Sequence, residues 1–357
     1  MMRVAFDTGP LHGPITGVGR AVESMFGHAS VDLVPYVLSY RATLRPNTVR
    51  LPYPAALALR SWGRFDHPRP DRHLGEVDLV HGTNYVVPPS RHPRLVTVYD
   101  CWALDHPGTV HRDIGSMMNA LRRAIHTGAH VHASSHATAE RLRVHFPDAA
   151  ITVIHLGAPA LVDARAGSID GLADDGPVIL SVGTLERRKN LPFLVSLMDD
   201  VLGAVPEARL VIAGGEGDDA PAVWSALENS SARVRERVHL LGRVDDTTVG
   251  RLYHRATVIA YPSLDEGFGF PVLEAMSTDT PIVASNVGSI PEVAGDAALL
   301  CPPSDRAAWI ESLVRALTDD DVRNRMIDNG RRQRAKFDWS RTARELEHLY
   351  RNLVDAT

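Results

Sequence analysis

The sequence reads Val258-Ile-Ala-Tyr-Pro-Ser-Leu-Asp-Glu-Gly-Phe-Gly-Phe-Pro-Val-Leu-Glu-Ala-Met276 at the point that decides its fold. Residues 258–260 are an apolar run of the kind that forms a buried strand. A glycine-rich turn follows, and Pro271 favours the first turn of a helix. Strand, turn and helix in this order are typical of a parallel α/β sheet.

The same alternation of apolar runs and amphipathic segments continues along the chain of 357 residues. Runs that are almost entirely apolar and separated by helical lengths predict parallel strands buried on both faces. The expected strands are residues 3–6, 33–37, 78–81, 94–98, 130–133 and 151–154 in the first half, and 178–182, 209–213, 238–241, 258–260, 282–284 and 298–300 in the second.

The pattern restarts after a polar stretch rich in glycine and aspartate, which we interpret as a linker. The expected parts are a first domain of residues 1–162, a linker of residues 163–176, a second domain of residues 177–337 and a C-terminal helical segment of residues 338–357, which could pack on either domain. The fold class is therefore α/β, with two Rossmann-like, doubly wound domains facing a central cleft. Ligands should bind outside the carboxyl ends of the strands.

The amino-acid composition limits the kinds of protein that this sequence can encode. A membrane helix needs about 18 consecutive apolar residues, and the sequence has no such run. Two cysteines, Cys101 and Cys301, fit a reducing cytosol. The net charge of -5 is uneven, because residues 1–157 hold 16 Arg against 12 Asp or Glu. This basic half suits an anionic acceptor or a membrane surface, although scattered solvated charge explains it equally well. We expect no nucleic-acid partner.

Two carboxylates in the opening stretch carry candidate chemistry. Glu266 lies in the glycine-rich turn, and Glu274 lies one or two turns into the helix. Carboxylates accept hydrogen bonds from paired sugar hydroxyls. Gly267 and Gly269 allow the backbone to approach a ligand closely and to direct N–H groups at it. The alternative is a capping carboxylate on an ordinary helix.

A second candidate stretch, Ser181-Val-Gly-Thr-Leu-Glu-Arg-Arg-Lys-Asn190, leaves the first strand of the second domain. Gly183 makes a tight turn, and Arg188 and Lys189 precede a helix. Two cations at a helix N-terminus form a good pyrophosphate site. The alternative is an exposed basic turn.

A third stretch, Thr16-Gly-Val-Gly-Arg-Ala21, follows the first strand of the chain. Its Gly17 and Gly19 would keep the helix N-terminus open to a phosphate, but Val22 replaces the third glycine of a dinucleotide motif. No acidic residue follows the second strand to hold a ribose, since Asp32 comes before it. An NAD-dependent oxidoreductase is therefore the weaker reading.

In this order the three stretches resemble family-four retaining glycosyltransferases, the "glycosyl transferases group 1", which have the GT-B fold. The resemblance covers nearly the whole chain and is most specific from Val178 to about Leu300. It includes Ala284-Ser-Asn-Val-Gly-Ser-Ile-Pro-Glu-Val293 and the closing Phe337-Asp-Trp-Ser340. The closing segment implies that the C-terminal helix, residues 338–357, returns to the first domain. Within the family, the sequence resembles a subgroup that transfers mannose and rhamnose.

The resemblance implies a role for each motif. Arg188 and Lys189 would bind the donor diphosphate, and Glu274 would bind the ribose hydroxyls. Glu266 would contact the donor sugar with help from backbone N–H groups. The further donor-binding residues that the resemblance implies are Gly183, Thr184, Val244, Gly267, Phe268 and Gly269. Residues of the first domain expected on the phosphate side of the cleft are Gly17, Gly19, Tyr99 and Asp100.

Two positions depart from the family. Thr184 stands where many members have an arginine, which leaves Arg188 and Lys189 as the local cations. Tyr99, before Asp100, stands where many members have a histidine near the transferred sugar. No active-site histidine can therefore be assigned, and a non-catalytic nucleotide-sugar-binding protein of the same fold is the alternative function.

The expected enzyme moves a hexose from a nucleoside-diphosphate sugar to a glycan, lipid-linked or small-molecule acceptor in polysaccharide biosynthesis. Fixed cations stabilise the leaving diphosphate without a metal. The Asp-x-Asp in Asp319-Asp-Asp321 is interpreted as a helix cap, not a metal site. Retention by a front-face mechanism, and guanosine-diphosphate mannose as donor, follow from the resemblance alone. We expect no cofactor.

Two helical segments and a histidine pair carry further expectations. An amphipathic helix is predicted over residues 339–353, with Ser340 as a possible cap. The helix near residues 113–127 would either touch a membrane through Met117, Met118, Leu121 and Ile125 or be half-buried in its domain. The spacing of His132 and His136 fits no metal site, and we interpret both as surface or cleft groups. The protein is expected in the cytoplasm, at the inner face of the membrane if it binds one.

Overall fold

The computed structural model describes residues 2–13, 16–39, 41–108, 112–165, 167, 169 and 176–356. The chain divides into two compact units. Unit 1 comprises Met1–Gly157 and Phe337–Thr357, and unit 2 comprises Ala158–Lys336. Residues 166, 168 and 170–175 of the expected linker lie outside the described residues.

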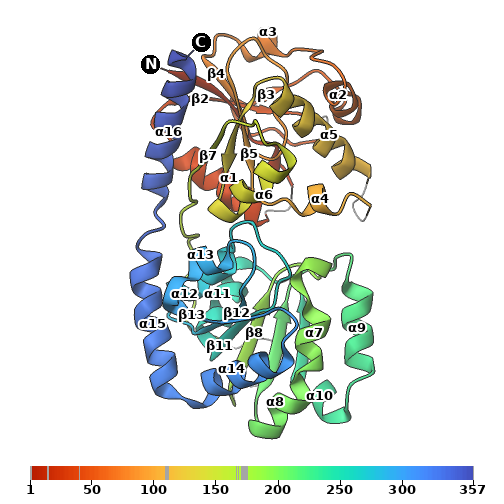
Figure 1. Ribbon diagram of the computed structural model, residues 1–357, viewed down its shortest axis with the longest axis vertical. Coiled ribbons are helices and arrows are strands. Elements are labelled where there is room, and N and C mark those ends of the chain that lie inside the picture. The colour runs from red at the N-terminus through yellow and green to blue at the C-terminus, as the bar shows by residue number, and fades with distance from the viewer. Residues whose placement is uncertain are drawn as a thin grey trace. The chain divides into compact units, whose positions relative to one another are not determined.

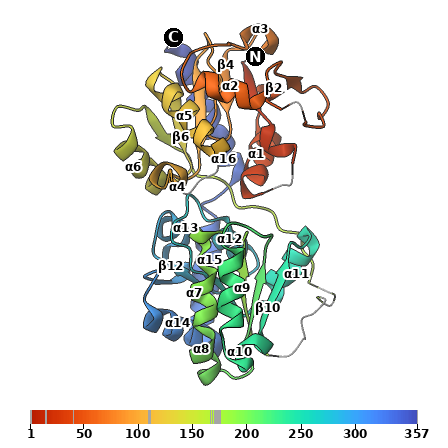
Figure 2. The same cartoon turned by 90° about the vertical axis from the view of Figure 1, so that its right-hand side faces the viewer.

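Unit 1 is built on a parallel sheet with the strand order β3-β2-β1-β4-β5-β6-β7. Helices α2 and α5 cover one face of this sheet, and α1 and α16 cover the other (Figures 1 and 2). The strands are β1 Arg3–Asp7, β2 Asp32–Val37, β3 Val49–Arg50, β4 Leu79–Gly82, β5 Arg94–Val98, β6 His130–Ala133 and β7 Ile151–Val153. The helices are α1 Gly17–His28, α2 Ala55–Trp62, α3 Asp71–Leu74, α4 Trp102–Asp105, α5 Arg112–His126, α6 His136–His145 and α16 Trp339–Asp355, with the 3-10 turn η1 Gly9–Leu11.

Unit 2 repeats this architecture with the strand order β10-β9-β8-β11-β12-β13, again all parallel. Helices α7, α8 and α9 lie on one side of the sheet, and α11, α12, α13 and α15 lie on the other (Figure 1). The strands are β8 Val178–Val182, β9 Arg209–Ala213, β10 Val238–Gly242, β11 Val258–Tyr261, β12 Ile282–Ser285 and β13 Ala298–Cys301. The helices are α7 Leu191–Ser196, α8 Met198–Ala204, α9 Ala220–Glu228, α10 Ala232–Arg237, α11 Asp246–Arg255, α12 Phe270–Ser277, α13 Ile290–Ala294, α14 Arg306–Thr318 and α15 Asp320–Arg334, with the 3-10 turns η2 Arg187–Lys189 and η3 Gly295–Ala297.

The two sheets confirm the predicted α/β class, and every expected strand is present within a residue or two. The side chains of the central strands are buried because helices cover both faces of each sheet. Strands β9, β11 and β12, for example, are buried at every residue. Strand β3 is not among the expected strands; it has only two residues and pairs with β2 at the sheet edge.

The C-terminal helix α16 belongs to unit 1, where it packs on α1 and β4. Trp339, Leu346 and Tyr350 are buried on its inner face. The expectation that Ser340 caps this helix is wrong, because Asp338 is the N-cap and accepts a hydrogen bond from the Ser340 N–H at 3.3 Å. Asp319 caps α15 as expected, accepting from the Val322 N–H at 3.0 Å.

A chain of buried hydrogen bonds joins α16 to the sheet of unit 1. The Tyr350 hydroxyl meets His81 Nδ1 at 2.8 Å, and His81 Nε2 meets the Thr97 hydroxyl at 2.8 Å. Thr97 in turn meets His132 Nδ1 at 2.9 Å, and His132 Nε2 donates to the Ile154 carbonyl at 2.9 Å. Since that carbonyl can only accept, each group along the chain donates to the next. His132 is therefore a fully buried structural residue, and its interpretation as a surface or cleft group is wrong.

Helix α5 is a domain helix. Met118, Leu121 and Ile125 are buried in the core of unit 1, and Met117 packs against it. These side chains are therefore not available for a membrane. Among the described residues, no helix is long and apolar enough to cross a bilayer.

Candidate active site

The middle of the unit 2 sheet positions the candidate site. Strands β8 and β11 are neighbours, with β9 and β10 on one side and β12 and β13 on the other. The direction in which strands are added reverses between β8 and β11, and ligands of doubly wound sheets bind outside the carboxyl ends of the strands at such a point. The segment after β8 carries Arg188 and Lys189, and the segment after β11 carries Glu266.

These three residues meet at one carboxylate. Glu266 Oε1 accepts hydrogen bonds from Lys189 Nζ at 2.6 Å and from the Ser263 hydroxyl at 2.9 Å. Glu266 Oε2 pairs with Arg188 NH1 at 2.9 Å. Lys189 Nζ also donates to the Tyr261 hydroxyl at 2.8 Å. We call these five residues the Glu266 cluster.

Burial and charge act against each other in the Glu266 cluster. Glu266 is 6% exposed and Lys189 is 8% exposed. Burial raises the pKa of Glu266, but the charges of Arg188 and Lys189 outweigh burial and hold this pKa at about 2. Burial lowers the pKa of Lys189, while the Glu266 carboxylate acts in the opposite direction. The two cations and one carboxylate together carry a single positive charge.

Backbone contacts fix the Glu266 cluster in place. The Leu264 N–H donates to the Arg188 carbonyl at 2.6 Å, which ties the segment after β11 to the segment after β8. The Glu266 carbonyl accepts from both the N–H of Ser289 at 3.0 Å and its hydroxyl at 3.1 Å. At Gly288, with a φ of +53°, a Cβ would lie 2.4 Å from the Glu266 carbonyl oxygen, so only glycine fits there.

The turn after β8 brings Gly183 beside the Lys189 side chain, while the side chain of the next residue, Thr184, lies against Gly217. A Cβ built on Gly183 would lie 3.3 Å from Lys189 Cε. A Cβ on Gly214, after β9, would lie 1.8 Å from the Gly183 carbonyl oxygen, so the two turns are in direct backbone contact. Arg188 and Lys189 lie on the 3-10 turn η2, and α7 begins just after them. Arg188 Nε also pairs with Glu186 at 3.1 Å.

Glu274 is buried in α12 and faces a different partner. Its Oε2 accepts a hydrogen bond from the Tyr253 hydroxyl of α11 at 2.6 Å. Gly269, with a φ of +91°, is the N-cap of α12, and Phe268 is buried beside Phe270. The turn that holds Gly267 therefore runs directly from Glu266 into the helix that holds Glu274.

Val244 lies further from the cluster. It follows β10, the edge strand, and the sheet order places β9 between β10 and β8. Val244 is half-buried, and Gly242 beside it has a φ of +65° and is exposed. The structure thus brings Arg188, Lys189 and Glu266 into direct contact. Val244 follows β10, which is separated from β8 by β9.

Unit 1 places its expected residues at the carboxyl ends of β1 and β5. Gly17 is exposed at the start of α1, whereas Gly19 is buried, and its N–H meets the Thr16 side chain at 3.5 Å. Tyr99 is 6% exposed, and its hydroxyl donates to the Thr83 carbonyl at 2.9 Å. Asp100 is half-buried, and its Oδ1 accepts from the Trp102 N–H at 3.0 Å.

Sequence reasoning assigned no role to three polar residues at the site, namely Tyr261 and Ser263 of the Glu266 cluster and Ser289, which bonds to the Glu266 carbonyl. Two of them, Tyr261 and Ser263, stand in a Tyr-Pro-Ser triplet directly after β11, and Ser289 stands in the stretch that follows β12. Their place after neighbouring strands was the available signal, because such positions converge at one sheet edge.

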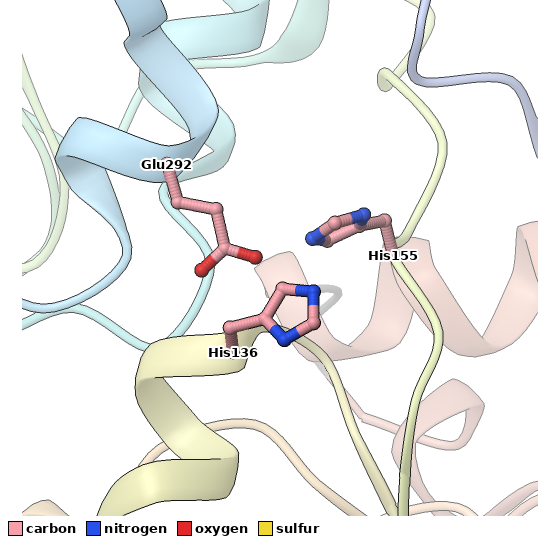
Figure 3. A group of neighbouring side chains, drawn as sticks. All are labelled: His136, His155 and Glu292. Atoms are coloured by element: carbon pink, nitrogen blue, oxygen red, sulfur yellow. The ribbon is translucent and has the colours of Figure 1, made fainter.

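Two histidines of unit 1 lie side by side near the carboxyl end of its sheet (Figure 3). The rings of His136, the first residue of α6, and His155, which follows β7, are 5.6 Å apart in an edge-on arrangement. His155 also packs on Phe337. Figure 3 also draws Glu292, which comes from α13 of unit 2. A zinc site takes at least three protein ligands, so the two imidazoles of unit 1 do not make one by themselves.

Comparison with known proteins identifies the class. Residues 168–333 match the family model described as Glycosyl transferases group 1, which is almost all of unit 2. O-antigen chain mannosyltransferase B of Escherichia coli is 27% identical over 99% of this chain and 100% of its own length. D-inositol 3-phosphate glycosyltransferase of Corynebacterium urealyticum is 32% identical over 51% of this chain and 45% of its own length.

Solved structures agree on the fold. Sucrose-phosphate synthase from Thermosynechococcus elongatus has a TM-score of 0.75 at 20% identity, covering 100% of both chains. HepE of Anabaena, solved in complex with UDP and glucose, has a TM-score of 0.73 at 14% identity, covering 99% of this chain and 100% of its own. Residues 168–333 therefore belong to the group 1 glycosyltransferases, and the chain has the GT-B fold.

Proposed function

We propose that this enzyme transfers a hexose, with mannose as the first candidate, from a nucleoside-diphosphate sugar to a glycan, lipid-linked or small-molecule acceptor with retention of configuration. The observation that carries the proposal is the Glu266 cluster, which holds Arg188 and Lys189 at the switch point of the unit 2 sheet. The name of the E. coli relative supports mannose, and the UDP in HepE supports a nucleotide donor. Guanosine diphosphate is our first choice of nucleotide.

The chemistry follows from the charges at the site. When the sugar–phosphate bond breaks, negative charge grows on the leaving diphosphate. Cations that are already fixed stabilise this charge without reorganising. Lys189 is held at 2.6 Å from Glu266 and at 2.8 Å from Tyr261, so its ammonium is positioned before any ligand arrives. We propose that these cations do the work that a divalent metal does in other transferases.

The expected donor role of Glu274 is compatible with its position. Its carboxylate is already bonded to Tyr253 through one oxygen, which orients the Glu274 side chain on α12. A carboxylate has about four acceptor sites, so a ribose hydroxyl could still bind it. We propose that Tyr253 orients Glu274 for this contact.

A thermal-shift screen across nucleoside diphosphates and their sugars tests the function. Guanosine diphosphate and its mannose ester should raise the melting temperature, since a ligand that binds the native state stabilises it. Transfer to a mannoside acceptor should continue in excess EDTA. Loss of transfer in EDTA would refute metal independence, and nucleotide-sugar binding with neither transfer nor hydrolysis would favour the non-catalytic alternative.

We also propose a peripheral membrane contact in the cytoplasm, made by α2 and the three residues after it instead of α5. Leu57 is 60% exposed and Phe65 is 62% exposed, and the exposed Arg60 and Arg64 lie between them in the sequence. Residues 33–65 contain no Asp or Glu. Apolar side chains flanked by arginines suit a surface of anionic lipids. The two cysteines are buried and unbridged, which fits a reducing compartment.

Vesicle sedimentation tests this contact. Vesicles containing phosphatidylglycerol should bind the protein, and vesicles of phosphatidylcholine alone should bind it much less. Replacing Leu57 and Phe65 by serine should release the protein while leaving its melting temperature unchanged, because both side chains are already exposed. Replacing the exposed Trp224 of unit 2 by serine is the matched control. Equal binding of the Leu57/Phe65 double variant would refute the surface.

A further inference from the structure

A second polar group lies in unit 1, at the carboxyl ends of β1 and β2. Asp7 is the last residue of β1, and Tyr36 of β2 is its partner in the parallel register. Paired residues of neighbouring strands project to the same face of a sheet. Asp7 Oδ1 accepts from the Gly9 N–H at 2.9 Å, while Oδ2 has no hydrogen-bond partner among the residues that the structure describes.

The buried hydroxyl of Tyr36 is a second, independent observation that points to a ligand here. It is 2% exposed, and within the described chain its hydroxyl has no hydrogen-bond partner. Buried tyrosine hydroxyls are nearly always bonded, because an unmade hydrogen bond costs free energy. The Asp7 carboxylate is close enough that, after burial, its charge contributes to raising the pKa of Tyr36 and that of Tyr99.

The position suits a ligand site. Strands β1 and β4 are neighbours in the order β3-β2-β1-β4, so Asp7 lies at the switch point of the unit 1 sheet. The backbone there is fixed, because the Thr83 hydroxyl donates to the Asp7 carbonyl at 2.8 Å and the Thr8 hydroxyl donates to the Tyr36 carbonyl at 3.0 Å. Asp7 Oδ2 and the Tyr36 hydroxyl are thus held in place with no hydrogen-bond partner among the described residues.

We infer that Asp7 and Tyr36 bind a hydroxyl group of a neutral sugar acceptor. A carboxylate accepts a hydrogen bond from such a hydroxyl, and the tyrosine donates one to its oxygen. A phosphate would be repelled by the carboxylate, so the site selects an uncharged sugar. This inference rests on the proposed transferase function and assigns part of its acceptor site to unit 1.

The titration of Asp7 is consistent with this assignment. Burial raises the pKa of Asp7 to about 7, although the Gly9 N–H acts in the opposite direction. Near neutral pH the carboxyl group can therefore both accept and donate, which suits a hydroxyl partner.

Calorimetric titration with methyl α-D-mannopyranoside in the presence of saturating GDP tests the inference. Wild-type protein should bind the mannoside, and Asp7→Asn should weaken its binding about tenfold or more, as expected for a hydrogen bond to a charged group. Tyr36→Phe should weaken it several-fold without lowering the melting temperature, because it removes an unpaired buried hydroxyl. Asp148→Asn, which changes an exposed carboxylate of the same unit, is the control.

Measuring the affinity of the wild type and the variants for GDP distinguishes a failure of this inference from a failure of the proposed function. All three variants should bind GDP as the wild type does, because the Glu266 cluster belongs to unit 2. Unchanged mannoside affinity in both Asp7→Asn and Tyr36→Phe overturns the inference, as does a wild-type protein that binds GDP but no mannoside. A lower melting temperature with unchanged mannoside affinity would show a purely structural role. If the wild type binds neither ligand, both proposals are wrong.

Discussion

Glu266→Gln is expected to lower turnover about 100-fold or more, as removal of a preorganised charge does in other active sites. The carboxylate holds Lys189 and Arg188 through separate oxygens. Glutamine keeps the shape but not the charge, so Lys189 and Arg188 lose the carboxylate that fixes their positions. Steady-state transfer from the donor sugar measures the effect.

The same variant should bind a nucleoside diphosphate at least as well as wild type, since removing the carboxylate removes a competitor for Arg188. Glu186→Gln is the matched control. Glu186 also pairs with Arg188, but its side chain is 39% exposed, and exposed ion pairs contribute little. Normal turnover in Glu266→Gln would remove Glu266 from the active site.

Acid stability checks the electrostatic basis of this expectation. The pKa of Glu266 is lowered from 4.5 to about 2, so its ion pairs stabilise the fold fully above about pH 4.5. This stabilisation is lost as the pH falls towards 2. The urea midpoint of the wild type should therefore exceed that of Glu266→Gln most clearly at about pH 6, and by less at about pH 3. A difference that grows on acidification would contradict the assigned ion pairs.

The strands were predictable because a buried parallel strand leaves a local signal. Runs such as residues 258–260 and 282–284 are apolar at every position, and no surface helix has that pattern. The two-residue strand β3 leaves no such signal, and its pairing with β2 depends on the loop that returns it to the sheet edge. Helix α5 was ambiguous because its periodicity shows an apolar face but not what covers that face.

Part of the site was predictable for a topological reason. Strand order brings the segments after β8 and β11 together, so Arg188, Lys189 and Glu266 were expected to be neighbours. The bond between Tyr253 and Glu274 depends on how α11 packs beside α12, which no local pattern specifies. His132 was misread because its alternation with apolar neighbours does not reveal the hydrogen bonds that allow a buried imidazole.

Lys189→Met is expected to reduce the affinity for a nucleoside diphosphate by about tenfold to a hundredfold. This range corresponds to the loss of one hydrogen bond to a charged group, about 1.5–3 kcal/mol. Methionine keeps the length and apolar stem of lysine, so the core around it stays filled. The variant should also melt at a lower temperature, because Glu266 remains buried with Arg188 as its only cation in the cluster. Titration calorimetry with GDP measures the affinity.

Two cations of unit 2 serve as controls for Lys189. Arg187 precedes the site on the same 3-10 turn but is exposed, and Lys336, the other lysine of the sequence, is exposed near the end of α15. Arg187→Met and Lys336→Met change the net charge as Lys189→Met does, so long-range attraction falls equally in all three. If the three variants bind GDP equally well, Lys189 acts only through net charge, and the diphosphate must be bound by other groups. A selective loss in Lys189→Met would show that the effect is local to the Glu266 cluster, as expected if its ammonium binds the diphosphate.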